Sequence, residues 1–461
     1  MHIKWSFYFL LILLAGCSDQ STILQQIKAS GELVVATRWG ADTYHSTEYG
    51  AAGIEHDLVE RFARHLGVKV RYHIADDFMH TIPLTSHNRV DFAAAGLIRS
   101  ELKGNRVIFS KAYRFDAPKI IGLRGTTRNK DDVFWKNNTV HIVSGSGIHD
   151  IFSKLNQDQT FVKTKAHNLG SAEPLVEKLL AKEIDYIAAP GFLVDLMQRY
   201  YPQLTVAVPL IEPQPISWAF PKTQDDSLRK EVDWFFTKLQ QEGTLASLID
   251  RYQGHINGAN YVSNMRFFKH MHKRLPKYKT WFQAASEKVE LDWRLLAAMG
   301  YQESLWDEKA ISPTGVRGIM MLTQITAKEM GVKKRTDPKQ SIFGGASYIL
   351  KLKKRLPADI PEPDRLWFAL AAYNVGYGHL QDARRLARRW QLNPNRWTDV
   401  KQVLPHLRDK AWHKHTKYGF ARGDEAVTYV TNIRHYYDLL SWQEQQNSTS
   451  LLSVANLPDV Q

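Results

Sequence analysis

Hydrophobic and polar positions alternate with two different periods along the chain. From about residue 23 to residue 253, short apolar runs alternate with stretches of helical spacing, a pattern typical of an α/β domain. After Tyr261 the strand-like runs nearly stop, and apolar residues recur at helical spacing. This change of period predicts an α/β domain followed by a mainly α-helical domain.

The first part opens with a strand, a helix and a second strand. Residues 33–36 form a short apolar run, residues 54–66 carry apolar side chains at helical spacing, and residues 68–72 form the next run. Gly67 is placed to end the helix in a left-handed conformation. Further strand-like runs lie at 90–95, 140–143 and 184–188. Repeated units of this kind predict one or two parallel sheets.

The second part contains several amphipathic helices. The first has one apolar face, made by Tyr278, Trp281, Phe282, Ala285 and Val289. Asp292 is the expected N-cap of a helix over 293–302, and further helices are expected over 366–373 and 429–442. Beyond these the sequence lacks an apolar face, so residues 444–461 are predicted to be a disordered tail.

Length and composition agree with two folded domains. The chain has 461 residues, more than one hydrophobic core usually accommodates. With 44% hydrophobic and 23% charged residues, it is neither a disordered chain nor a protein with many membrane spans. The net charge of +14 favours a polyanionic partner, which can be nucleic acid, anionic lipid or an acidic wall polymer.

The N-terminus has the features of a secretory signal. The apolar run over residues 5–15 is shorter than the roughly 20 residues of a spanning helix, and it ends in Leu14-Ala15-Gly16-Cys17. Cys17 is the single cysteine of the chain, so no internal disulfide forms. The Leu-Ala-Gly-Cys sequence resembles the lipobox of bacterial lipoproteins, which implies removal of the signal, lipidation of Cys17 and attachment to the membrane.

The residue after the lipobox cysteine bears on location. Lipoproteins held at the inner membrane usually carry aspartate there, whereas this chain has Ser18. The resemblance therefore implies the periplasmic face of the envelope, at the inner leaflet of the outer membrane. Export from the cytoplasm argues against nucleic acid as the partner.

Glu303 is the main candidate for acid–base chemistry. It lies at the end of an apolar helix, beside Leu305 and Trp306, where desolvation raises the pKa of a carboxyl group. A carboxylic acid that keeps its proton near neutral pH can protonate a leaving glycosidic oxygen. Taken alone, however, a glutamate near a helix end is usually a surface or capping residue.

Three blocks around and after Glu303 resemble the lytic transglycosylase branch of the lysozyme-like superfamily. The first block reads Glu303-Ser304-x-Trp306, then Ala310-x-Ser312-x-x-Gly315-x-x-Gly318-x-Met320. The second is Ala371-Ala372-Tyr373-Asn374-x-Gly376, and the third is Tyr429-Val430 with Ile433. The resemblance implies a lysozyme-like fold and cleavage of the glycan strands of peptidoglycan, in cell wall turnover and remodelling.

The family resemblance assigns roles to several side chains. Glu303 acts alone as acid and then base, and the N-acetyl group of the substrate replaces the second carboxylate of other glycosidases. The 6-hydroxyl of N-acetylmuramic acid captures the intermediate and gives a 1,6-anhydro product without a cofactor. The expected substrate-binding residues are Ser312, Met320, Tyr373, Asn374 and Tyr429.

Some features of the site depart from the family or stay open. Met321 stands where the family usually has a sugar-binding glutamine. Asp307 and Glu308 are close enough in sequence to act as a second catalytic carboxylate, although exposed loop carboxylates are commoner. For Tyr373 and Tyr429, the alternative to substrate binding is packing in the core. His413 and His415 lack a cluster of partners, so no metal site is predicted.

The first domain resembles the family-three periplasmic solute-binding proteins. The matching segments are Gly31–Thr37, Gly53–Leu58, Val90–Phe92 with Ala95–Leu97, and Phe109-Ser110 before Tyr113. The resemblance implies two α/β lobes around a ligand cleft at the ends of the strands. Lys103 replaces the arginine that binds an amino-acid carboxylate in that family, and Pro190 replaces an acidic residue, so the expected ligand is a muropeptide or stem peptide that regulates catalysis.

The whole chain is therefore similar to membrane-bound lytic transglycosylases that join both domains. The expected architecture is an α/β bilobal periplasmic-binding-protein-like domain at 18–260, after the signal at 1–17, plus a mainly α lysozyme-like domain at 261–443 and the tail at 444–461. Two alternatives to this interpretation remain: a second domain that is a non-enzymatic receptor and only binds the wall, or one that is a hydrolytic muramidase.

Overall fold

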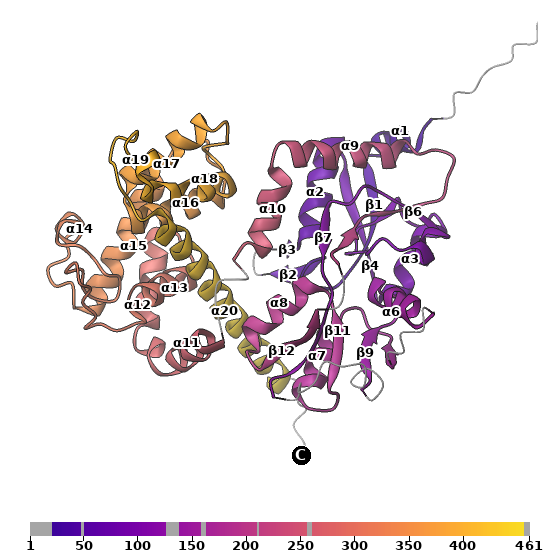
Figure 1. Cartoon of the computed structure of the whole chain (residues 1–461), viewed down its shortest axis with the longest axis horizontal. Coiled ribbons are helices and arrows are strands. Elements are labelled where there is room, and N and C mark those ends of the chain that lie inside the picture. Colours follow the sequence, from indigo (N-terminus) through magenta and orange to yellow (C-terminus); the bar gives the residue numbers. More distant parts are fainter. Residues whose placement is uncertain are drawn as a thin grey trace, which may run out of the picture.

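The computed structural model describes residues 21–47, 50–125, 138–157, 163–209, 212–255 and 261–455. It confirms the predicted change of class: two α/β lobes form one half of the molecule, and the other half is helical (Figure 1). The predicted signal with Cys17 lies outside the described residues, as do the domain boundary within 256–260 and the last six residues of the tail.

The first lobe is built on a five-stranded sheet in the order β4-β1-β5-β14-β6. The predicted strand–helix–strand unit is confirmed, because β1 pairs in parallel with β4 from Glu32 opposite Lys69 to Arg38 opposite Ala75. Gly67 ends the intervening helix α2 at φ 75°. The elements of this lobe are α1 (Ile23–Ser30), β1 (Glu32–Arg38), β2 (His45–Thr47), β3 (Gly50–Ala52), α2 (Ile54–Leu66), β4 (Lys69–Ala75), α3 (Phe78–Ser86), β5 (Phe92–Ala93), α4 (Glu101–Gly104), β6 (Val107–Phe109), β14 (Ala219–Pro221), α9 (Ser227–Gln241) and α10 (Thr244–Gln253).

One strand of this sheet is shorter than the sequence pattern indicates. The apolar run at 90–95 forms a strand only at Phe92–Ala93. Asp91 bonds to Val34 of β1 twice: its N–H donates to the Val34 carbonyl at 2.8 Å, and its carboxylate accepts from the Val34 N–H at 2.7 Å, so a side chain stands in for the second backbone bond of the ladder. Ala94 still donates to the carbonyl of Ala36, which keeps the end of the run beside the sheet.

The second lobe has its own five-stranded sheet, in the order β10-β9-β11-β8-β12. The predicted strands at 140–143 and 184–188 are confirmed as β9 and β11, which pair in parallel. The elements of this lobe are β8 (Lys119–Leu123), β9 (Val140–Val143), α6 (Gly147–Gln157), β10 (Thr164–His167), α7 (Glu173–Leu180), β11 (Tyr186–Ala189), α8 (Gly191–Tyr200) and β12 (Leu204–Pro209).

The chain crosses between the lobes on a pair of antiparallel strands. These are β7 (Arg114–Asp116) and β13 (Gln214–Ile216), with Phe115 opposite Pro215. Two short connections of this kind allow the lobes to rotate about the strand pair. The ends of the strands of both sheets then face one cleft.

The helical half packs around one enclosed helix. Every residue of α13 from Leu295 to Tyr301 is buried, so this helix is covered on all sides and its C-terminal end is fixed within the domain. Asp292 caps it, as predicted, by accepting from the N–H of Arg294 at 2.8 Å. The elements are α11 (Tyr261–Lys273), η2 (Leu275–Lys277), α12 (Lys279–Val289), α13 (Trp293–Ser304), α14 (Gln324–Glu329), α15 (Pro338–Arg355), α16 (Asp364–Val375), α17 (Tyr377–Arg389), α18 (Trp397–Val403), η3 (Leu404–Arg408), α19 (Lys410–His413) and α20 (Gly423–Ala455).

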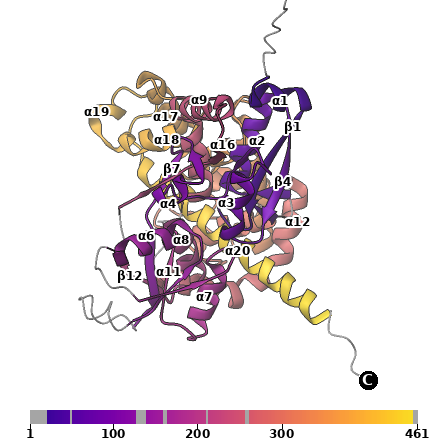
Figure 2. The same cartoon turned by 90° about the vertical axis from the view of Figure 1, so that its right-hand side faces the viewer.

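Helix α20 joins the two halves and corrects one prediction. It packs on α13 and α16 and then runs beside the second lobe, where Trp442 stacks on Tyr200 at 4.7 Å between ring centroids (Figures 1 and 2). It continues to Ala455, so the backbone of residues 444–455 is helical rather than disordered. The reason is that extending a helix already nucleated and anchored costs little, even where no apolar face is available. In the described ranges, every helix is too short or too polar to span a lipid bilayer.

Candidate functional site

Glu303 is the second-last residue of α13, at the end of the most enclosed helix of the domain. Two successive residues after this helix have left-handed backbones, Leu305 at φ 55° and Trp306 at φ 56°. Such conformations are strained for side chains of this size and persist only where the surroundings enforce them. Here Trp306 is fully buried, and its indole N–H donates to the carbonyl of Ala297 at 2.8 Å. The helix end that carries Glu303 is thereby locked in place.

The carboxyl group of Glu303 is set up to hold a proton. Burial raises its pKa from 4.5 to about 8, against the hydrogen bond from Tyr429, which lowers it. The hydroxyl of Tyr429 donates to Oε1 at 2.6 Å. Near neutral pH the group is therefore largely protonated, as the sequence analysis predicted from its apolar neighbours. One carboxyl oxygen is held by Tyr429, and the group can act as a general acid.

Two tyrosines from different helices define one wall of the site. Tyr373 from α16 and Tyr429 from α20 stack with their ring planes at 12° and their centroids 6.4 Å apart. The hydroxyl of Tyr373 donates to the carbonyl of Met320 at 2.9 Å, which ties the loop after α13 to α16. Burial and the nearby Glu303 raise the pKa of both phenols well above 10, so both stay neutral donors.

The two methionines of the loop, Met320 and Met321, differ in burial. Met320 was predicted to bind substrate, but its side chain is fully buried and packs close to Gly345 in the core. Its contribution to the site is the backbone carbonyl that holds Tyr373. Met321, which stands in place of the family glutamine, is only partly buried and has φ 44°. Its position beside Gly318, whose carbonyl accepts from its N–H at 3.1 Å, leaves its side chain at the surface of the loop.

Ser312 and Asn374 have different surroundings. The Ser312 hydroxyl accepts from the N–H groups of Thr314 and Val316, both at 3.2 Å, and so shapes its own turn. Among the described residues no hydrogen bond joins Ser312 to Glu303, so Ser312 does not orient the acid. Asn374 directly follows Tyr373 near the end of α16, and it is exposed and presents its amide to solvent.

The neighbouring acidic residues do not form a pair with Glu303. Asp307 is exposed and accepts from the N–H of Lys309 at 2.9 Å. Glu308 accepts from the hydroxyl of Tyr278 at 3.2 Å. Burial and the Tyr429 hydrogen bond are the causes that act on the pKa of Glu303, and no charged side chain of the described residues is among them. The site therefore contains one acid, which fits an acid–base mechanism with a single carboxyl group.

Replacing Tyr429 by phenylalanine tests this arrangement. The Tyr429 hydrogen bond favours the ionised carboxylate, so its loss raises the pKa of Glu303 further. Because the acid must be protonated, the alkaline limb of the pH–rate profile should move to higher pH, by about one pH unit for a lost bond to a charged group. The measurement is the initial rate of release from purified peptidoglycan between pH 5 and pH 10.

The matched control for this variant is Tyr373→Phe. It removes the same hydroxyl from the stacked partner ring, but that hydroxyl bonds to Met320 and not to Glu303. Its alkaline limb should stay in place. An unchanged limb in Tyr429→Phe, or an equal displacement in both variants, contradicts the role given to Tyr429.

The α/β half contains a second site, the cleft between its lobes. In this structure the lobes are closed: a Cβ at Gly147 would lie 2.3 Å from Ile98, and Arg38 donates to Gly170 of the other lobe at 3.2 Å. The remaining cavity measures about 30 Å³, which is room for about one water molecule. A larger ligand enters only when the lobes separate.

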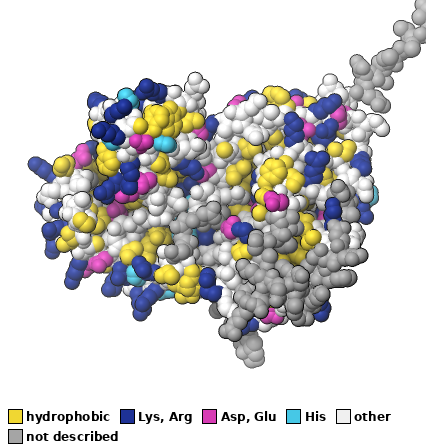
Figure 3. Space-filling model, viewed as in Figure 1, with side chains coloured by type: hydrophobic (Ala, Val, Ile, Leu, Met, Phe, Trp, Pro, Cys, Tyr) yellow, Lys and Arg dark blue, Asp and Glu magenta, His cyan; other side chains and the backbone are white. Residues whose placement is uncertain are grey.

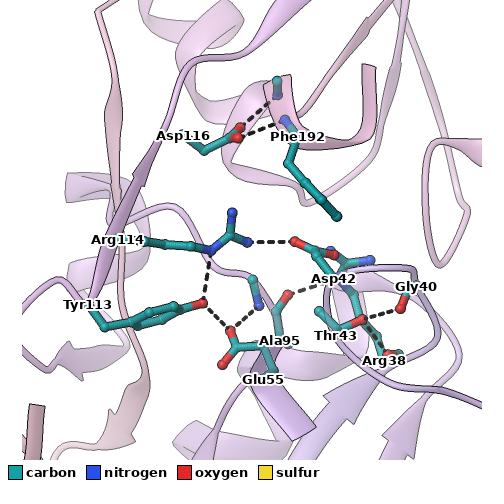
Figure 4. Close-up of polar contacts among 12 residues, drawn as sticks. Arg38, Gly40, Asp42, Thr43, Glu55, Ala95, Tyr113, Arg114, Asp116 and Phe192 are labelled. Atoms are coloured by element: carbon teal, nitrogen blue, oxygen red, sulfur yellow. Dashed lines mark hydrogen bonds and ion pairs between the residues drawn. The ribbon is translucent and has the colours of Figure 1, made fainter. Parts of the chain in front are cut away.

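Buried charges line this cleft (Figure 4). Arg114, on the crossing strand β7, donates to Asp42 at 2.7 Å, and Asp116 accepts from the N–H groups of Gly191 and Phe192 at 2.8 and 2.9 Å. Behind them Glu55 accepts from Trp218, Gly96 and Tyr113, and burial raises its pKa. The acidic and basic groups satisfy one another while the cleft is closed, so a ligand must replace these contacts.

The structure shows the surroundings of Lys103 and Pro190, which replace the ligand-binding residues of the family-three receptors. Lys103 is buried and forms an ion pair with Asp150 of the other lobe, so it fastens the closed form instead of facing a ligand. Pro190 lines the cleft at the start of α8. Glu173 was not predicted from the sequence: its Oε2 is buried at the cleft and has no hydrogen-bond partner among the described residues. Its position in the first turn of α7 gave no signal in the sequence, because glutamate is common at the start of a helix.

Comparisons with known proteins agree with both halves. Residues 280–393 match the transglycosylase SLT domain, and residues 32–255 match the bacterial extracellular solute-binding proteins of family 3. The chain is 41% identical over 456 residues to the membrane-bound lytic murein transglycosylase F of Pseudomonas putida strain W619, covering 98% of this chain and 94% of that protein. It is 43% identical over 420 residues to membrane-bound lytic murein transglycosylase F 1 of Alkalilimnicola ehrlichii, covering 91% and 85%.

Solved structures resemble the α/β half. A mutant of ArgBP from T. maritima covers 50% of this chain and 98% of its own, at 20% identity and a TM-score of 0.44. The solute receptor for L-cysteine of Neisseria gonorrhoeae covers 51% of this chain and 95% of its own, at 16% identity and a TM-score of 0.46.

Proposed function

From the premise that this chain belongs to the membrane-bound lytic murein transglycosylases that carry a family-three solute-binding domain, we propose how its single acid cleaves peptidoglycan. The reaction is non-hydrolytic cleavage of the β-1,4 bond between N-acetylmuramic acid and N-acetylglucosamine, which leaves a 1,6-anhydro end. The observation that carries this proposal is the lone Glu303 carboxyl group, with a pKa of about 8 and one oxygen held by Tyr429.

The first step is proton donation. Protonated Glu303 gives its proton to the glycosidic oxygen as the bond from C1 to that oxygen breaks. The carbonyl oxygen of the substrate's own N-acetyl group attacks C1, so no protein carboxylate is needed as nucleophile. Asn374, whose amide is exposed at the end of α16, orients the N-acetyl group. The leaving N-acetylglucosamine carries the proton away.

The second step returns the proton. Ionised Glu303 takes the proton of the 6-hydroxyl, whose oxygen attacks C1 and displaces the N-acetyl oxygen. The product is the anhydro sugar, and Glu303 is protonated again, so atoms and protons balance without water. Tyr429 stabilises the ionised carboxylate between the two steps, because its hydrogen bond is stronger to the charged form.

The products separate this proposal from its alternatives. Purified peptidoglycan is digested with the protein, and the released muropeptides are identified by mass spectrometry. Anhydro ends are expected, 18 mass units lighter than reducing ends because one water is not added. Reducing ends instead would identify a hydrolytic muramidase, and no release would favour a receptor that only grips the wall.

Attachment to the envelope is the second part of the proposal. The lipobox sequence at 14–17, together with the word "membrane-bound" in the names of the relatives, supports lipidation at Cys17 and the inner leaflet of the outer membrane. Mass spectrometry of the N-terminal peptide should show a diacylglycerol thioether and an acylated amine. An N-terminal peptide without these modifications would overturn lipidation, and fractionation of the unaltered protein with the inner membrane would overturn the location.

The solute-binding domain senses a wall fragment and regulates catalysis in this proposal. The cleft offers two arginines and a partnerless Glu173 oxygen, which suits a ligand with both carboxylate and amine groups, such as a stem peptide. Opening and closing of the lobes is the expected response to such a ligand.

One turn of α20 is fastened to both lobes, which gives this signal a route. From the first lobe, Asp250 binds Arg434 at 2.9 Å. From the second lobe, Arg199 donates to Asp438 at 3.1 Å and to His435 at 2.8 Å. A change in the angle between the lobes cannot keep both sets of contacts unaltered. The same helix carries Tyr429, which donates to Glu303, so the lobes and the catalytic acid share one rigid element.

Ligand binding to the cleft is tested by thermal denaturation with muropeptides. The protein should be stabilised in proportion to RT ln(1 + [L]/Kd), which is about 2.7 kcal/mol at a hundredfold excess over Kd. The matched variant Glu173→Gln keeps the shape of the side chain but loses its charge, so the stabilisation should fall. Absence of stabilisation in the unaltered protein would count against the sensor, whatever the outcome for glycan cleavage.

A further inference from the structure

The positive charge of the chain is concentrated in one short segment. Residues 384–422 contain eleven Lys or Arg and two Asp, so this segment of the catalytic domain carries nine of the 14 excess positive charges. Some of these side chains are used internally; Arg384, for example, is buried against Asn395. Others are exposed, namely Arg388, Arg389, Lys410 and Lys414, and no ion pair within the described residues involves any of the four.

Aromatic side chains are exposed within the same segment. Tyr418 and Phe420 are 51% and 53% exposed, although large aromatic side chains are usually mostly buried. Within the same segment, the rings of Trp390, His406 and Trp412 pack edge to face and stabilise its fold. We call the group of Arg388, Arg389, Lys410, Lys414, Tyr418 and Phe420 the basic–aromatic face. Exposed aromatic rings beside basic side chains are the composition of a surface that enters the headgroup region of a membrane.

The face lies on the same edge of the molecule as the first described residues of the chain. Helices α17 and α19 lie at the upper edge of Figure 1, as do α1 and α9 of the other domain, and Figure 2 shows the same after a quarter turn about the vertical axis. Dark blue and yellow side chains gather at this upper left corner of Figure 3. Helix α9 repeats the composition, with Trp234 49% exposed and Lys238 5.0 Å above its ring.

We propose that the basic–aromatic face docks on the anionic surface of a lipid bilayer and fixes the orientation of the enzyme on its membrane. A flat partner is favoured because two patches of like composition, from two domains, share one edge with the N-terminal helix. The inference rests on the proposed attachment to the membrane, and it adds a second contact that does not depend on lipidation.

The expected strength follows from the number of charges. Each basic side chain at an anionic membrane surface strengthens binding by roughly fivefold. Removal of four should weaken vesicle binding by well over tenfold, even if they act only in part. The attraction should also weaken as salt is raised, because exposed charges are screened over a Debye length of about 8 Å at physiological ionic strength.

The test uses the chain from residue 21 to the end, which retains every described helix and strand and lacks Cys17. Its binding is measured by co-sedimentation with vesicles of phosphatidylcholine alone and with 30% phosphatidylglycerol. The test variant changes Arg388, Arg389, Lys410 and Lys414 to glutamine. The control changes four exposed lysines between α14 and the start of α15 to glutamine, namely Lys328, Lys333, Lys334 and Lys339, and so has the same net charge.

The unaltered chain and the control are expected to bind the phosphatidylglycerol vesicles alike, and the test variant at least tenfold more weakly. Equal binding by the two variants, or no binding of the unaltered chain to these vesicles, overturns the proposal. Loss of binding to isolated peptidoglycan instead of vesicles would assign the face to the wall. Both variants should digest peptidoglycan normally in solution, so failure of the docking proposal and failure of the catalytic proposal give different results.

Discussion

Replacement of Glu303 by glutamine should lower the rate of glycan cleavage by about a thousandfold or more, at the upper part of the range for a general acid–base group. In the proposed mechanism the same carboxyl group donates the proton in the first step and accepts it in the second, and among the described residues no second carboxylate acts on its pKa. Glutamine keeps the shape of the side chain and can still accept the hydrogen bond from Tyr429. The measurement is the initial rate of release of anhydro-muropeptides, determined by mass spectrometry.

The control for this variant is Glu308→Gln, which makes the same chemical change five residues later. Glu308 bonds to Tyr278, so activity should stay within severalfold of the unaltered protein. A comparable loss in both variants would mean that the carboxylates act as a pair. An active Glu303→Gln protein would remove the acid role and leave the receptor alternative.

Stability gives a second readout for Glu303→Gln. The folded-state pKa of Glu303 is about 8, above its ordinary value of 4.5, so the folded protein binds this proton more tightly than the unfolded chain. The contribution of the group to stability is therefore complete below the unfolded pKa and is lost as pH rises from about 4.5 to about 8. Glutamine does not titrate. As pH rises across this range, the melting temperature of the variant should increase relative to that of the unaltered protein. The same measurement shows that the variant is folded, so its lost activity does not come from unfolding.

Replacement of Gly318 by alanine should be the most damaging small change to the fold around the site. Gly318 has φ 82°, and a Cβ there would lie 1.9 Å from the backbone oxygen of Arg335. Backbone on both sides of the clash cannot move away as a flexible side chain could. Left-handed strain and forced displacement together should cost about 3 kcal/mol. For a domain of this size that is a fall of about 6–12 °C in the melting temperature.

Gly315→Ala is the matched control in the same loop. Gly315 has φ 79°, but nothing lies within 4 Å of the place where its Cβ would be. Only the conformational strain applies, about 1 kcal/mol, so the melting temperature should fall by about 2–4 °C. If the two variants melt alike, the close approach at Arg335 does not limit the fold.

Local sequence patterns were sufficient for elements whose signals lie within a few residues of one another. The helix over 54–66 ends at Gly67 because glycine adopts the left-handed cap without strain, and the pattern places both ends correctly. The cap at Asp292 is equally local. The strand predicted at 90–95 was too long, because the Asp91 carboxylate, instead of a backbone carbonyl, accepts from the N–H of Val34, which is distant in sequence.

The residues of the two sites also fall into those that local sequence predicted and those that depend on tertiary packing. Glu303 was found from its apolar helix and its motif, and its raised pKa follows from the predicted burial. The role of Met320 was wrong as a substrate contact, because sequence cannot show which side of a loop faces the core. Glu173 was missed, since a buried oxygen without a partner is visible only once the two lobes are placed together.

The sequence by itself determined the two domain classes, the family and the candidate acid, because periodicity, capping and a spaced motif are properties of neighbouring residues. Only the tertiary structure decided that Tyr429, 126 residues away, holds the acid, and that one turn of α20 is fastened to both lobes. These contacts arise when helices from distant parts of the chain pack around α13. Their distances depend on the packing of all the intervening residues, and no local pattern records it.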